Sequence, residues 1–152
     1  MFTSFSANDT MRLGESLGAC LSKGTAIGLI GDLGSGKTCF VKGIYKKLAN
    51  KEPLLVTSPT FTIVHEYKAA IPIFHFDVYR IKGIDDFHTI GFEDYLERGG
   101  ICIVEWIDKI PGAINLDIEI KFEIINEQER RICFFGLTEK GKSIMSSLRG
   151  RL

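Results

Sequence analysis

The apolar positions along the 152-residue chain follow two spacings, and their alternation predicts helices interleaved with strands. Apolar residues at helical spacing predict a first helix that begins at Ser6 or Asn8 and runs to about Lys23, and a second helix over 37–49. Between them, a short apolar run over 25–30 predicts a buried strand that ends at a glycine. The first third of the chain is therefore expected to form a helix, a strand and a helix.

The rest of the chain carries shorter apolar runs of both kinds. Strands are predicted over 54–56, 61–67, 71–76, 101–104, 116–125 and 132–137, and helices over 84–89, 92–98 and 138–148. The run 101–104 is continuously apolar, which is typical of a central strand covered on both faces. The second and third strands of this set are expected to form an antiparallel pair, and the last two are expected to be partners. This order predicts a three-layer α/β/α fold whose central sheet is mostly parallel with an antiparallel part.

Composition, length and net charge limit the number of domains and the possible binding partners. Apolar residues make up 45% of the chain and charged residues 25%, as in ordinary globular proteins, and the length suits one domain over residues 1–152. Lys plus Arg and Asp plus Glu number 19 each, so the formal net charge is zero. Binding to nucleic acid or to an anionic membrane by bulk electrostatics needs an excess of positive charge. We therefore expect any contact with nucleic acid to be local or indirect.

The cysteines and the hydropathy pattern indicate a reducing compartment. The four cysteines form no C-x-x-C pair and have no zinc-ligand spacing, and Cys102 and Cys133 lie in apolar runs that favour buried structural thiols. No uninterrupted apolar stretch approaches the roughly 18 residues of a membrane span, and no signal segment is recognisable. The expected location is the cytoplasm, with no membrane partner.

One motif in the chain carries specific chemistry. Residues 31–38, Gly-Asp-Leu-Gly-Ser-Gly-Lys-Thr, fit the Walker A pattern G-x-x-x-x-G-K-[ST] between a predicted strand and a predicted helix. Backbone amides and the helix N-terminus then face a polyphosphate, Lys37 reaches the β- and γ-phosphates, and the hydroxyl of Thr38 is a ligand of Mg²⁺. The residues expected to bind a nucleotide through this loop are Asp32, Leu33, Gly34, Ser35, Gly36, Lys37 and Thr38.

A magnesium site also needs carboxylates, and two acids end apolar strands. Asp77 follows the strand over 71–76, and Glu105 follows the strand over 101–104. We assign Asp77 to the metal or its bound water, and Glu105 to the metal and the attacking water. The alternative for each acid is that it is only the first solvated residue after a strand. His75 alternates with Asp77 on one strand face and is expected to fix its carboxylate by a hydrogen bond, or else to be a satisfied core histidine.

The remaining residues discriminate among nucleotide-hydrolysing classes. A GTPase is unlike this chain, because no D-x-x-G motif is present and Asn50-Lys51-Glu52-Pro53 lacks the final Asp of a guanine-reading motif. A small P-loop kinase acting on a small-molecule acceptor stays open as the alternative, although few arginines are available for a lid. A scaffold that binds its partner without nucleotide is a third reading. Whichever of the nucleotide-hydrolysing classes applies, the residues expected at the reacting phosphates are Lys37, Asp77 and Glu105.

Several motifs together resemble the TsaE family, and the resemblance covers residues 8 to 148. Cys39 stands where the family usually has a hydroxyl residue. The motifs occur in the family's order: Gly31 to Thr38, Ser58-Pro59-Thr60-Phe61-Thr62, His75-Phe76-Asp77-Val78-Tyr79-Arg80, Gly91-Phe92-Glu93-Asp94-Tyr95 and Val104-Glu105-Trp106.

The resemblance implies a Mg²⁺-dependent ATPase that acts with a TsaB–TsaD complex. That complex transfers a threonylcarbamoyl group to the adenosine beside the tRNA anticodon, so this chain would meet tRNA indirectly. In the absence of the complex, its hydrolysis of ATP would be slow. Thr60, in the segment 58–62, would be a further catalytic residue that senses the γ-phosphate, and Trp106 would shield or orient the nucleotide. Thr10 would lie close to the adenine, and Arg130 matches a family arginine at the nucleotide site.

Overall fold

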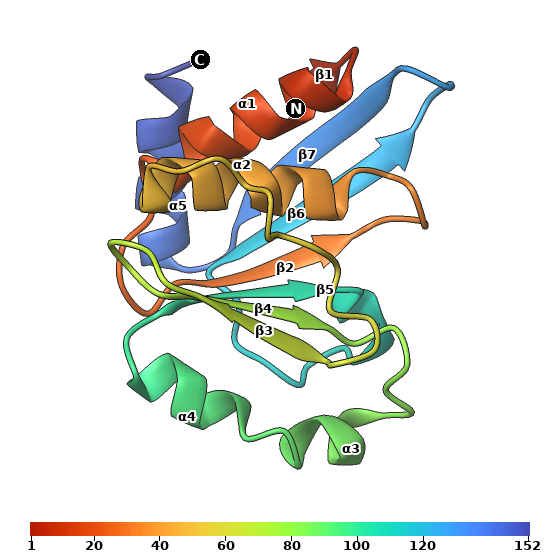
Figure 1. The fold of residues 1–152 in the computed structure, drawn as a ribbon, viewed down its shortest axis with the longest axis vertical. Coiled ribbons are helices and arrows are strands. Elements are labelled where there is room, and N and C mark those ends of the chain that lie inside the picture. The colour runs from red at the N-terminus through yellow and green to blue at the C-terminus, as the bar shows by residue number, and fades with distance from the viewer.

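The computed structural model describes all 152 residues as a seven-stranded sheet with helices on both faces (Figure 1). The strands are β1 (Phe2–Ser4), β2 (Ala26–Ile30), β3 (Val64–Tyr67), β4 (Ile73–Asp77), β5 (Ile101–Glu105), β6 (Ile118–Ile124) and β7 (Arg130–Gly136). The helices are α1 (Ala7–Gly18), α2 (Lys37–Ala49), α3 (Ile84–His88), α4 (Phe92–Glu97), the 3₁₀ turn η1 (Ile107–Lys109) and α5 (Glu139–Arg149).

The sheet is parallel in its centre and antiparallel at both sides. Its order is β1-β7-β6-β2-β5-β4-β3, in which β6, β2, β5 and β4 are parallel neighbours. The pairs β3 with β4, β6 with β7, and β1 with β7 are antiparallel. The predicted fold class is confirmed, as are the predicted antiparallel pairing of β3 with β4 and the predicted partnership of β6 with β7. Because β2, β4 and β5 run the same way, their carboxyl ends meet at one edge of the sheet, where α/β proteins place their ligands.

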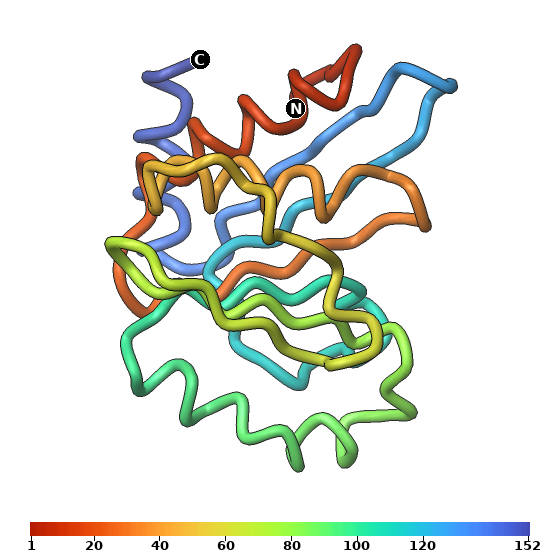
Figure 2. The backbone as a smooth tube through the Cα atoms, viewed as in Figure 1, coloured from red at the N-terminus to blue at the C-terminus, as the bar shows by residue number.

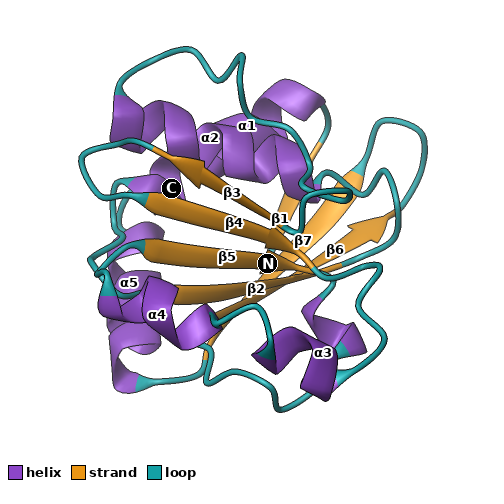
Figure 3. Cartoon of the chain, turned by 60° about the horizontal axis from the view of Figure 1, so that its bottom comes forward, coloured by secondary structure: helices purple, strands orange, loops and turns teal.

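Alternating residues of the central strands build two separate cores. On β4, Ile73 packs toward α1, α2 and α5, whereas Phe74 and Phe76 pack toward α3 and α4. The same alternation on β5 places Ile101 and Ile103 in the first core, with Cys102 and Val104 in the second. Figure 2 traces the backbone through the sheet and the helices on either side of it, and Figure 3 shows α3 and α4 on the face of the sheet opposite α1 and α2. This two-sided burial explains why these strands are continuously apolar.

The two helices beside the Walker-type loop touch along their backbones. A Cβ atom at Gly43 of α2 would fall on the carbonyl of Met11 in α1, and one at Gly14 of α1 would fall on the carbonyl of Phe40 in α2. Glycine is therefore required at both positions for this separation of the helices. The close crossing fixes α2, whose first turn belongs to the loop.

One predicted strand is absent. Residues 54–56 form a turn in which the N–H of Val56 donates to the carbonyl of Pro53 (3.1 Å). Leu54 and Leu55 are 87% and 78% exposed, and only the side chain of Val56 is buried. The prediction of a strand was wrong because three consecutive apolar residues satisfied the pattern without a neighbouring strand to pair with.

Other elements differ at their ends. The strand predicted from residue 61 begins at Val64, because Ile63 has a left-handed backbone (φ 71°) that interrupts the extended chain. The first helix is capped by Ser6, whose side chain accepts the N–H of Asp9, but it ends at Gly18 rather than near Lys23. The short edge strand β1 was not predicted. None of the helices combines the length and the apolar character needed to cross a membrane.

Candidate phosphate-binding site

The loop between β2 and α2 has the backbone that its glycines permit. Gly31, Gly34 and Gly36 have φ values of 152°, 76° and 104°, which residues with a Cβ rarely adopt. At Gly31 a Cβ would also collide with the backbone of Phe122. Gly36 directly precedes α2, and no side chain caps the helix there. The amides of the first helical turn therefore remain available to an anion, and the helix dipole favours negative charge at this end.

Lys37 is folded back onto the loop. Its ammonium donates to the carbonyls of Gly31 and Asp32, the latter at 3.0 Å, and lies 3.9 Å from the centre of the Trp106 ring. This places a cation against an aromatic face, an attractive arrangement when it is shielded from water. The side chain is buried although it has no carboxylate partner within ion-pair distance. Lys37 thus lies at the loop with its charge satisfied by neutral oxygens.

The two predicted carboxylates are neighbours. Asp77 pairs with Glu105 in the register of the parallel strands β4 and β5, and both residues are 2% exposed. The hydroxyl of Thr38, in the first turn of α2, donates to Oε1 of Glu105 (2.9 Å). Burial lowers the pKa of Lys37, and the charges of Glu105 and Asp77 oppose that shift. One cation and two acids therefore share a small, poorly hydrated volume.

The segment 58–62 is attached to this volume through Asp77. Oδ2 of Asp77 accepts from the hydroxyls of Ser58 (2.7 Å) and Thr60 (3.0 Å). Its other oxygen, Oδ1, accepts from the N–H of Tyr79 (2.9 Å). Sequence patterns had placed Thr60 near the site through the family motif. They did not single out Ser58 or Tyr79 as partners of this carboxylate.

His75 contacts the other carboxylate. Its Nε2 lies 2.8 Å from Oε1 of Glu105, and no hydrogen bond joins it to Asp77. The prediction that His75 fixes Asp77 was wrong. The two residues share one face of β4 but are separated along the strand by about 7 Å. The longer side chain of Glu105, on the adjacent strand, spans the distance to the imidazole instead.

Two residues beside the acids have strained backbones. Ile63, which follows the segment 58–62, and Trp106, which follows Glu105, have φ values of 71° and 65°. Such conformations are costly for bulky side chains and tend to occur at functional sites. The N–H of Trp106 donates to the carbonyl of Leu29 (2.9 Å), which holds the residue after Glu105 against β2.

Thr10 and Arg130 lie on the other side of the loop. Thr10 is buried in α1, where its hydroxyl lies 2.7 Å from that of Ser4, and a Cβ at Gly36 would touch its methyl group. The guanidinium of Arg130 makes a long hydrogen bond to the carbonyl of Gly34 (3.4 Å). Both residues line a cavity of about 600 Å³ that also includes Gly34 and Gly36. The positions predicted for the nucleotide therefore flank one loop.

The remaining predicted residues converge on an adjoining cavity of about 350 Å³. Asp32 contributes its carbonyl to Lys37 and lies outside this lining. The predicted residues in the lining are Leu33, Gly34, Ser35, Gly36, Lys37, Thr38, Thr60, Asp77, Glu105 and Trp106. Cys39, Ser58 and Tyr79 complete it, and the ring of Tyr79 packs 4.8 Å from that of Trp106.

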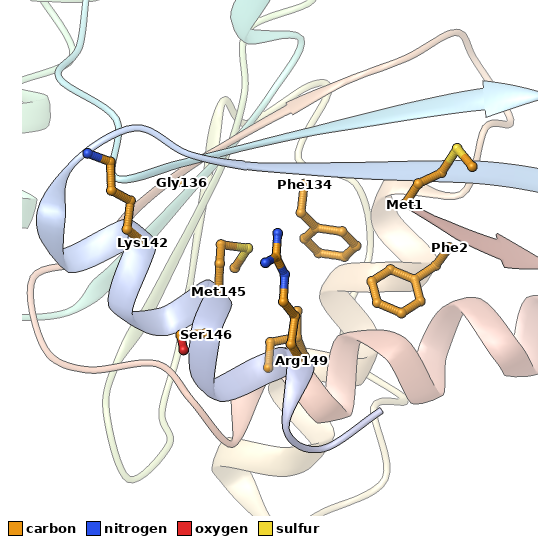
Figure 4. Close-up of a pocket in the computed structure, with 9 residues that line it drawn as sticks. Met1, Phe2, Phe134, Gly136, Lys142, Met145, Ser146 and Arg149 are labelled. Atoms are coloured by element: carbon orange, nitrogen blue, oxygen red, sulfur yellow. The ribbon is translucent and has the colours of Figure 1, made fainter.

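A third cavity is unrelated to these residues. It measures about 320 Å³ and lies between β1, β7 and α5, where the rings of Phe2 and Phe134 meet edge to face at 5.6 Å (Figure 4). Met145 and Arg149 of α5 face these rings. None of the predicted site residues lines it. The predicted site residues are thus concentrated at the edge of the sheet where the carboxyl ends of β2, β4 and β5 meet.

The three-layer α/β/α fold, the glycine loop before α2 and the paired acids define a protein of the P-loop α/β class. A sequence model described as "Threonylcarbamoyl adenosine biosynthesis protein TsaE" matches residues 4–132. The chain therefore belongs to the TsaE family, as its motifs indicated, and that family functions in threonylcarbamoyladenosine biosynthesis.

Individual relatives agree over most of their length. The tRNA threonylcarbamoyladenosine biosynthesis protein TsaE of Treponema pallidum is 35% identical over 84% of this chain and 93% of its own. The protein of the same name from Aquifex aeolicus is 38% identical over 84% of this chain and 89% of its own. The crystal structure of YdiB from Bacillus subtilis superimposes with a TM-score of 0.75 at 26% identity, covering 99% of this chain and 93% of that one.

Proposed function

We propose that this protein is a Mg²⁺-dependent ATPase that serves threonylcarbamoyladenosine modification of tRNA with a TsaB–TsaD type complex in the cytoplasm. The observation that carries the proposal is the convergence of Lys37, Thr38, Asp77 and Glu105 at the carboxyl edge of the sheet. Family membership supports the pathway, since curated relatives are named as tRNA threonylcarbamoyladenosine biosynthesis proteins. The partner complex and the contact with tRNA through it are part of the proposal.

The donors at this edge fit a magnesium ion. The hydroxyl of Thr38 and the carboxylates of Glu105 and Asp77 are oxygen ligands, which Mg²⁺ prefers, and both carboxylates are buried. These three residues would hold the ion directly or through water. When bound with ATP, it would neutralise charge on the phosphate oxygens.

The loop would bind the triphosphate. Backbone amides at the start of α2 donate to phosphate oxygens, and Gly34 and Gly36 leave the backbone open to them. Lys37 would exchange its carbonyl partners for the β- and γ-phosphates. This exchange favours binding, because a charged acceptor makes a stronger hydrogen bond to an ammonium than a neutral carbonyl does.

Glu105 and Thr60 would act at the γ-phosphate. Glu105 accepts hydrogen bonds already, and in the complex it would orient the attacking water and take its proton. Thr60 would exchange its bond to Asp77 for a contact that depends on the γ-phosphate, so that the segment 58–62 differs between ATP and ADP. Trp106 would cover the site beside Lys37, and Thr10 and Arg130 would flank the nucleoside. A partner would complete this site, so hydrolysis by the protein alone should be slow.

Reconstitution of threonylcarbamoyl transfer to tRNA with a TsaB–TsaD complex tests the proposal. The wild-type protein should support many rounds of transfer with ATP consumption, and Glu105→Ala should reduce the multiple-turnover rate by about 100-fold or more. Glu139→Ala, at an exposed glutamate of α5, is the matched control and should behave as wild type. Equal product with and without the protein would contradict the proposal. Formation of ADP only when a small-molecule acceptor is added would favour a kinase.

A further inference from the structure

The imidazole of His75 is enclosed in the first core and linked to the site by a single hydrogen bond. The side chain is 0% exposed, and its Nε2 lies 2.8 Å from Oε1 of Glu105. The other ring nitrogen, Nδ1, is buried with no hydrogen-bond partner. A neutral imidazole that donates from Nε2 carries its proton there, so Nδ1 is left as an unpaired acceptor.

This arrangement is poorly suited to a purely structural residue. An unpaired buried nitrogen costs stability, since it has lost its hydrogen bonds to water. Ile73, two residues earlier on the same face of β4, fills a similar environment with an apolar side chain. An apolar residue at position 75 would avoid the cost but would remove the one donor that reaches Glu105 from the core.

The hydrogen bonds of Glu105 distinguish its two oxygens. Oε1 accepts both from His75 and from the hydroxyl of Thr38, whereas Oε2 accepts no hydrogen bond from the protein. When Thr38 turns to a metal ion, as the proposed function requires, His75 becomes the only protein donor that holds this carboxylate. Oε1 would then be held by His75, and Oε2 would be free to accept a hydrogen bond from the attacking water.

The imidazole is itself supported by the edge strand. The ring of Tyr67 packs 6.1 Å from it at an interplanar angle of 39°. The hydroxyl of Tyr67 donates to the carbonyl of Thr57, directly before the segment 58–62, and also lies 3.1 Å from Nδ1 of His65. His75 is thus packed against the residue that fixes the base of that segment.

We propose that His75 is a positioning residue for ATP hydrolysis: it holds Glu105 through Oε1 so that Oε2 can orient the attacking water. The inference rests on the proposed function. It assigns to His75 no contact with substrate, and its effect passes through Glu105 alone.

Substitutions that differ in their donor test this role. The amide nitrogen of Gln occupies about the place of Nε2, so His75→Gln should keep the hydrolysis rate within about threefold of wild type. His75→Asn, whose amide falls short, and His75→Leu, which has no donor, should lower it by about 10- to 100-fold, as is typical for groups that orient a ligand. His88→Leu, at the exposed histidine of α3, is the matched control and should have no effect.

Single-turnover hydrolysis with protein in excess over ATP, and separately measured ATP affinity, give the readouts. The affinity should change less than about threefold, because the loop and Lys37 bind the phosphates. In a Glu105→Gln background, His75→Asn should cause no further loss of rate, since the two residues act as a unit. If His75→Leu does not fold, the hydrolysis rates of His75→Gln and His75→Asn still test the positioning role.

The outcomes separate this inference from the proposed function. Equal rates for wild type and His75→Asn, or an undiminished effect of His75→Asn in the Glu105→Gln background, would overturn the positioning role and leave the ATPase proposal standing. Absence of hydrolysis by wild type, with or without the partner complex, would overturn both.

Discussion

At the scale of single residues, Lys37 combines a favourable binding geometry with an unfavourable environment for folding. Its ammonium is buried against loop carbonyls and the Trp106 ring, and burial lowers its pKa despite the nearby acids. The lowered pKa means that the folded state holds this proton less tightly than the unfolded chain does. In the proposed function, Lys37 would therefore favour phosphate binding at the expense of stability, as functional residues often do.

Replacing Lys37 by methionine should separate these effects. Lys37→Met should abolish ATP binding and raise the free energy of unfolding by about 0.5–1 kcal/mol. Between the lowered pKa and the ordinary value of 10.5, the unfolded wild type binds more protons than the folded protein. Its unfolding free energy should therefore gain from rising pH in that interval, and Lys37→Met should lack this gain.

Urea denaturation between pH 7 and pH 10 and calorimetric titration with ATP measure both effects. Lys51→Met, at an exposed lysine, is the control and should change neither. A loss of more than about 1 kcal/mol of unfolding free energy in Lys37→Met, or retained ATP binding by this variant, would contradict this explanation.

At the scale of elements, hydrophobic spacing predicted most helices and strands because each buries one face or both. It failed at 54–56, where exposed leucines imitate a strand, and near Ile63, whose left-handed backbone no pattern of polarity encodes. For the site, the pattern succeeded with Asp77 and Glu105, because their positions at the ends of apolar strands predicted that they lie near the loop. The partner of His75 could not be predicted, because it depends on which strand lies beside β4 and on the reach of a side chain from it.

The crossing of α1 and α2 depends on glycine. Gly43→Ala should lower the free energy of unfolding by about 1–3 kcal/mol, because its Cβ would overlap the carbonyl of Met11 and force the helices apart. Gly83→Ala is the control, since its φ of 171° suits alanine and no atom lies within 4 Å of the added Cβ. Equal midpoints of urea unfolding for the two variants would show that the helices move apart at little cost.

At the scale of the whole molecule, the order of the strands explains why motifs that are distant in the sequence lie close together. Because β5 lies between β2 and β4, the loop after β2 meets Glu105 and Asp77 at one edge. Their roles, the bound ATP and Mg²⁺, and the single domain over residues 1–152 stay predictions. The balanced charge of the chain agrees with a protein that reaches tRNA through partners rather than by its own electrostatic field.

Release of inorganic phosphate from ATP in the presence of a TsaB–TsaD complex shows whether this protein is a Mg²⁺-dependent ATPase. We expect the wild-type protein to release phosphate with Mg²⁺ and not with EDTA, and Glu105→Gln to lower the rate by about 100-fold or more. Release that is unchanged by EDTA, or equal for wild type and Glu105→Gln, would contradict this expectation.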